Sequence, residues 1–102
     1  MIGYDPIVDN MVIIDQQDFS HFFGVDGDPF PAGTTVTVKI FSRDGDQLGA
    51  WPAVTVQSSG ALVQITSDDL APVSDACTFK VFVQYPDSAD MCWYRGRVWR
   101  RT

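Results

Sequence analysis

Glutamate is absent from this sequence, and all thirteen acidic residues are aspartate. Glutamate favours helices, whereas aspartate favours turns and helix caps, so this acid usage predicts strands joined by polar turns. The chain also has only one histidine and two cysteines, which match none of the usual zinc spacings. No set of acid, base and nucleophile is visible. We therefore expect no enzymatic activity, no cofactor and no metal site.

Long apolar runs are missing as well. The longest strictly aliphatic run, Met11 to Ile14, is much too short for a signal-peptide core or a membrane span, and the N-terminus has no basic region. We expect a protein that is made in the cytoplasm without a signal peptide, stays soluble and does not contact a membrane.

The size and composition suit one compact domain. The 102 residues are 45% hydrophobic, which is ample for a single core. We predict one domain over residues 1–102, in which residues 1–8 form an extended N-terminal arm.

The alternation of apolar and polar residues predicts strands near residues 10–15, 18–24, 34–42, 47–57, 61–66, 76–85 and 91–100. Seven short strands are typical of an all-β, antiparallel β-sandwich with immunoglobulin-like or related topology, and we predict this fold. Residues 67–70 could form one helical turn capped by Ser67, and residues 26–33 form a long polar loop.

The clearest hairpin turns at Asp44-Gly45, because this pair readily supplies the positive φ angles of a tight turn. We expect the even-numbered residues on both of its strands, from Val36 to Val56, to face the core. Pro52 cannot donate a ladder hydrogen bond, so the return strand is either an edge strand or bulged at Trp51-Pro52.

The two cysteines are predicted to be free thiols. A second hairpin around residues 86–90 would separate Cys77 from Cys92 by about seven residues along the ladder, on the order of 23 Å. A disulfide needs Cα atoms within about 7 Å.

Three further polar features have plain structural explanations. Ser20 points to the opposite face of its strand from His21, so the two cannot form a local catalytic pair, and we interpret His21 as a structural or surface residue. The segments 26–28 and 44–46 each offer two carboxylates that calcium could use. Neither matches the calcium-loop pattern, and turn chemistry explains both.

Charge is distributed unevenly along the chain. Residues 1–94 carry three cations against thirteen Asp, a balance of −10, whereas the last eight residues carry +4. An acidic body repels phosphate, so we do not expect nucleic-acid binding. The terminal arginines form either an ordinary solvated strand or an arginine docking surface.

The most distinctive segment is residues 91–100. Strand alternation puts Cys92, Tyr94, Gly96 and Val98 on one face, and Trp93, Arg95, Arg97 and Trp99 on the other. The second set is a stripe in which guanidinium groups can stack on indoles, and Trp and Arg are enriched in interface hot spots. Alternatively, the Trp face packs on the second sheet and Tyr94 faces outward. Gly96 marks a bulge or a close backbone approach. The candidate interface residues are Trp93, Arg95, Arg97, Trp99, Arg100 and Arg101.

The order of several segments resembles a known family. An early acidic strand at residues 12–19 is followed by PAGTTV at 31–36, RDGD at 43–46 and WYRGRV at 93–98. This arrangement is similar to the LtfC-like small β-sandwich domain of actinobacterial tailed-phage proteins, over nearly the whole chain from about residue 8. The resemblance implies a non-enzymatic virion component, usually called a minor tail protein, and carries no catalytic residues.

We therefore expect a structural and docking module of a phage particle, located in the virion and binding other virion proteins or copies of itself. A tail or tail-tip subunit, a capsid-decorating protein and a head–tail-joining protein all fit this description. A carbohydrate-binding module is the alternative from another class, because Trp51, Trp93 and Trp99 could form a platform for host glycans.

Overall fold

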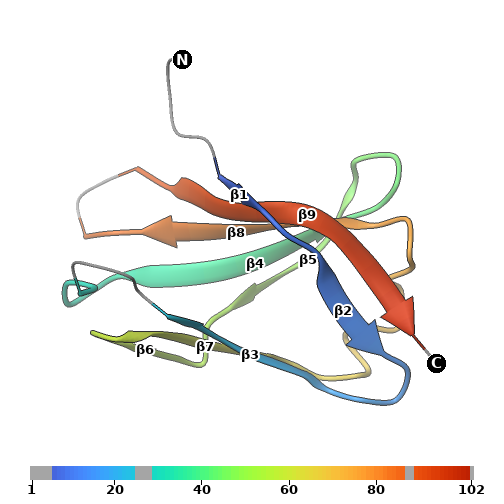
Figure 1. Cartoon of the computed structure of the whole chain (residues 1–102), viewed down its shortest axis with the longest axis horizontal. Helices are drawn as coiled ribbons and strands as arrows, with labels where there is room; N and C mark the ends of the chain where they lie inside the picture. Colours follow the sequence, from blue (N-terminus) through green and yellow to red (C-terminus); the bar gives the residue numbers. More distant parts are fainter. Residues whose placement is uncertain (1–5, 25–28, 87–88, 102) are drawn as a thin grey trace.

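The computed structural model describes residues 6–24, 29–86 and 89–101, and these residues form nine strands in two sheets with no helix (Figure 1). The all-β sandwich prediction is confirmed. The strands are β1 (Ile7–Val8), β2 (Met11–Ile14), β3 (Phe19–Gly24), β4 (Thr35–Phe41), β5 (Gln47–Pro52), β6 (Thr55–Gln57), β7 (Gly60–Ile65), β8 (Thr78–Gln84) and β9 (Met91–Arg101). None of the nine strands contains an aspartate, as the acid usage indicated.

The larger sheet has six strands in the order β1-β9-β8-β4-β5, and β2 also pairs with β9. β1 and β2 follow one another along β9, and both run parallel to it. This parallel edge departs from the predicted antiparallel sandwich. A parallel pair needs a long connection, and here the rest of the domain lies between β2 and β9. Ile7 and Val8, which we placed in an extended arm, form β1.

The smaller sheet has three antiparallel strands in the order β3-β7-β6. The predicted strand 47–57 is divided between the two sheets, because the chain leaves β5 at Pro52 and enters β6 at Thr55. At the crossing, the Ala53 N–H donates to the Val36 carbonyl at 2.8 Å, and the Val54 N–H donates to the Leu62 carbonyl at 2.9 Å. β5 is an edge strand, which is one of the two arrangements predicted from Pro52.

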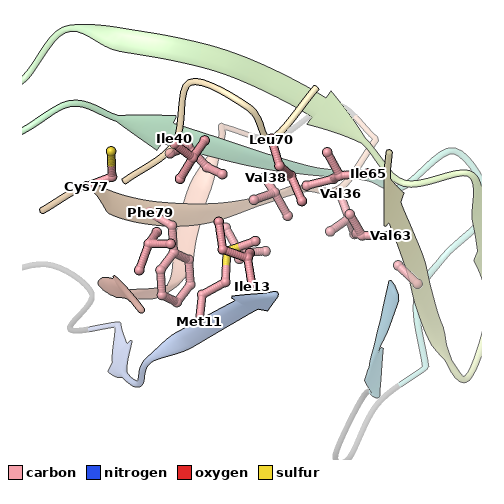
Figure 2. Close-up of a cluster of buried hydrophobic side chains, with 14 of the residues drawn as sticks. Met11, Ile13, Val36, Val38, Ile40, Val63, Ile65, Leu70, Cys77 and Phe79 are labelled. Atoms are coloured by element: carbon pink, nitrogen blue, oxygen red, sulfur yellow. The ribbon is translucent and has the colours of Figure 1, made fainter. Parts of the chain in front are cut away.

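The core fills the space between the two sheets (Figure 2). Alternate residues of β4, β7 and β8 supply most of it, while β2, β9 and the turn after β7 close its sides. The buried residues include Met11, Ile13, Val36, Val38, Ile40, Ala61, Val63, Ile65, Leu70, Val73, Phe79, Val81, Val83 and Val98.

The β4–β5 hairpin has the expected turn, but the predicted core-facing positions are correct for β4 and largely wrong for β5. Gly45 has a φ of 93°, and the Ser42 N–H donates to the Asp46 carbonyl at 2.7 Å. The even-numbered residues of β4 are buried as predicted. Directly opposed residues of an antiparallel pair share a face, and Val38 lies opposite Trp51. Gly49 and Trp51 therefore face the core, and Ala50, Val54 and Val56 are exposed. Leu48 packs against the core as predicted, because a register shift beside Phe41 breaks the alternation at that point.

Residues 67–70 form hydrogen-bonded turns rather than a helix, and Ser67 is not the cap. The Leu70 N–H donates to the Thr66 carbonyl at 3.2 Å, and the Asp69 N–H donates to the Thr66 hydroxyl. The Ser67 N–H instead donates to the Asp18 carboxylate at 2.7 Å. A one-turn helix has too few internal hydrogen bonds to compete with these side-chain partners.

Candidate functional site

A bulge in β9 decides which of its side chains face outward. Tyr94 lies opposite Val81, but Cys92 lies opposite Phe82, so Trp93 is an extra residue between the two pairs. C-terminal to this bulge, Tyr94, Gly96 and Val98 face the core, and Arg95, Arg97 and Trp99 face outward. Of the two arrangements left open by the sequence, this part of β9 adopts the one with Tyr94 inside.

Trp93 does not belong to the outward stripe, which corrects the sequence prediction. Its ring lies 5.6 Å from that of Phe30 and 6.2 Å from that of Tyr85, and it packs half-buried against the core. Simple alternation failed here because Trp93, as the extra residue of the bulge, has no partner on β8 and does not follow the alternation of the strand.

The outward residues of β9 join those of β8 and β4 in one surface. Arg95 lies opposite Lys80, and Lys80 lies opposite Lys39, so three cations form a row across three strands. Arg97 and Arg101 precede and follow Trp99 by two residues on β9. Their guanidinium carbons lie 5.1 and 5.4 Å from the centroid of the Trp99 ring. We call this surface the basic face; it comprises Lys39, Phe41, Lys80, Phe82, Arg95, Arg97, Trp99 and Arg101.

The basic face holds five of the seven cations of the chain. Like charges directly opposite one another in a sheet destabilise it, and the strands supply no aspartate to neutralise them. Aromatic rings offset part of this cost: the Lys39 ammonium lies 4.7 Å from the centroid of Phe82, and that of Lys80 lies 5.5 Å from Phe41. The surface is therefore suited to carboxylates presented by another molecule.

Arg100 was predicted in the interface, but it faces the opposite way and bonds within the domain. Its Nε donates to the Asp15 carboxylate at 2.5 Å, and its Nη1 donates to the carbonyls of Leu70 and Val73 at 2.9 and 2.7 Å. Its backbone N–H donates to the Asp75 carboxylate. Arg100 thus ties the end of β9 to two turns.

The three tryptophans do not form one glycan platform. Trp51 faces the core from β5, Trp93 packs against Phe30 and Tyr85, and Trp99 lies on the basic face. Sugar platforms need exposed rings that share a plane, so this arrangement overturns the proposed Trp51, Trp93 and Trp99 set.

The remaining candidate groups are the two cysteines and the two acidic turn segments. Cys77 and Cys92 are free thiols. Asp44 and Asp46 lie in the β4–β5 turn, whereas Asp26 and Asp28 lie outside the described residues. Within residues 6–24, 29–86 and 89–101, no three His, Cys or Asp side chains are grouped to hold a metal ion. The same ranges contain no helix long and apolar enough to cross a membrane.

Sequence reasoning missed four members of the basic face: Lys39, Phe41, Lys80 and Phe82. The signal was available in part, since the buried even positions of β4 require Thr37, Lys39 and Phe41 to share the outer face. The pairing of β4 with β8 and of β8 with β9 was needed to bring the three strands together.

Fold and surface together define a small β-sandwich domain with a cationic and aromatic outer sheet face. Residues 5–101 match the family described as LtfC-like, beta-sandwich domain. The chain belongs to this family, as the sequence resemblance indicated. No curated protein and no solved structure matches the chain significantly.

Proposed function

We propose that the protein is a non-enzymatic structural component of a bacteriophage particle, such as a minor tail or tail-tip protein, that docks through its basic face. The family membership, together with the sequence resemblance to phage proteins, supports a location in a phage particle. The basic face supports the role, because its row of like charges weakens the free domain and points to an acidic partner.

The chemistry of the basic face defines the class of partner. The face presents planar Arg donors beside half-buried Trp99 and exposes them on a sheet, where a partner surface can cover several at once. Carboxylates on a virion protein would neutralise the row Lys39, Lys80 and Arg95. The acidic turns of a second copy are one source of such carboxylates, which would give a head-to-tail array.

The same face would serve a capsid-decorating or head–tail-joining protein. The location within the particle follows from the partner, and a mass-spectrometric inventory of separated tails and capsids identifies it.

The test is the double substitution Arg97→Ala with Trp99→Ala in the phage. We expect the variant domain to fold in isolation and to be lost from purified particles, because these two side chains lie on the outer face. Gln64→Ala with Thr55→Ala is the matched control, since both residues are exposed on the three-stranded sheet. A double variant that enters particles at normal copy number would remove the basic face from the interface.

A further inference from the structure

An open cleft separates the edges of the two sheets. Among the described strands, β2 pairs only with β9 and β3 pairs only with β7, so each has one free edge. The two strands diverge from the short connection at residues 15–18 (Figure 1). Between them lies a cleft of about 510 Å³, lined by residues 9–14 and 17–24, with core residues such as Phe79 and Tyr94 at its base.

The wall formed by β3 is aromatic on its inner side. Phe19, His21 and Phe23 lie opposite Ile65, Val63 and Ala61, which are fully buried, so they share the inner face. The His21 ring lies 6.3 Å from that of Phe19 and 4.6 Å from that of Phe23. His21 is nevertheless exposed, because nothing in the described structure covers this side of the sandwich.

We propose that this cleft binds an extended segment of another protein, which adds a fourth strand to the smaller sheet beside β3. A free strand edge presents a row of backbone donors and acceptors that a peptide strand can pair with. The six residues of β3 offer an edge of about 20 Å. The smaller sheet has half as many strands as the larger one and leaves part of the larger sheet's inner face uncovered. The added strand would lie across this uncovered part.

The lining also specifies the composition of the segment. Apolar residues at alternate positions would meet Phe19, Phe23 and the side chains of β2. Asp9 and Asp18 line the cleft, and no described Lys or Arg does, so the segment should carry cations at its ends. The apolar, cationic strands of a second copy, β8 and β9, are already paired within their own sheet, which favours a different polypeptide. This site is separate from the basic face and does not depend on the proposed function.

The test uses the isolated domain and a synthetic peptide, Lys-Val-Thr-Val-Thr-Val-Lys, with amide hydrogen exchange as the readout. We expect saturable protection of amides in β3, and binding at least about fivefold tighter than that of the same peptide with Asp in place of both Lys. His21→Lys places a charge on the inner face and should abolish the protection. Gln64→Lys, on the outer face of β7, is the matched control and should retain it.

Three results would overturn the proposal. The first is a lack of protection in β3 at millimolar peptide, and the second is equal protection of the edge strands β5 and β6. The third is concentration-dependent protection of β3 without peptide, which would assign the cleft to a second copy instead of another protein.

Discussion

Gly96→Ala tests the crossing of the N-terminal segment over β9. A Cβ atom placed on Gly96 would lie 1.6 Å from the carbonyl oxygen of Asp9 and 2.8 Å from its carbonyl carbon. Because a normal C···O contact is about 3.3 Å, the two backbones must separate by about 1.7 Å. The sequence prediction of a bulge or a close backbone approach at Gly96 resolves to the close approach.

The cost depends on how much of the N-terminal segment is displaced. The cheapest response lifts β1 and Asp9, because Ile7 and Val8 are largely exposed and lose little burial. This breaks the bond from the Asp9 N–H to the Arg95 carbonyl, 3.0 Å long, and the short β1 ladder. At about 1 kcal/mol for each lost hydrogen bond, unfolding should become easier by about 2–3 kcal/mol. Displacement of β2, which buries Met11 and Ile13, would add to this.

Chemical denaturation monitored by tryptophan fluorescence measures the change. Gly24→Ala is the matched control, because among the described residues a Cβ there meets only Phe22, at 3.8 Å, and should be neutral or slightly stabilising. Amide exchange in the Gly96→Ala variant should rise first in β1. Equal stability of the two variants would refute the assigned crossing.

Three other predictions follow from local geometry. Arg100→Ala should lower the free energy of unfolding by about 2 kcal/mol, because it removes an ion pair and leaves the carbonyls of Leu70 and Val73 without their charged donor; a change within error would mean that water replaces the guanidinium. Gly45→Val should cost at least about 1 kcal/mol, since a β-branched residue fits a φ of 93° badly, whereas Gly45→Asn should cost less; an unchanged melting temperature for the Val variant would contradict the turn. Both cysteines should react with a maleimide after denaturation without reductant, and a mass spectrum without added labels would show a disulfide.

The sequence was sufficient for the class of fold and for most strand positions. Apolar alternation located the buried faces of β4 and β8, and Asp-Gly located the turn with positive φ. These features depend on neighbours along the chain or across one hairpin, which is the range over which sequence patterns are informative.

The remainder depended on contacts between distant segments. The parallel pairing of β2 with β9 joins residues about ninety positions apart, and no local pattern specifies it. The bulge at Trp93 depends on how β9 fits β8, yet it reverses the facing of Trp93 and removes it from the candidate site. Arg100 was misplaced for a related reason: its partners, Asp15, Leu70 and Val73, come from two other turns.

The separation of charge links the fold to the proposed docking. Strand propensity disfavours Asp, so the described acids lie between the strands, while five of the seven cations lie on the outer face of the larger sheet. This distribution separates positive from negative charge on the surface of the domain, and it does so without an aspartate in any of the nine strands. Because like charges in the row Lys39, Lys80 and Arg95 weaken the free domain, an acidic partner relieves that repulsion as well as adding contacts. Binding at the basic face should therefore weaken with salt and stabilise the bound domain.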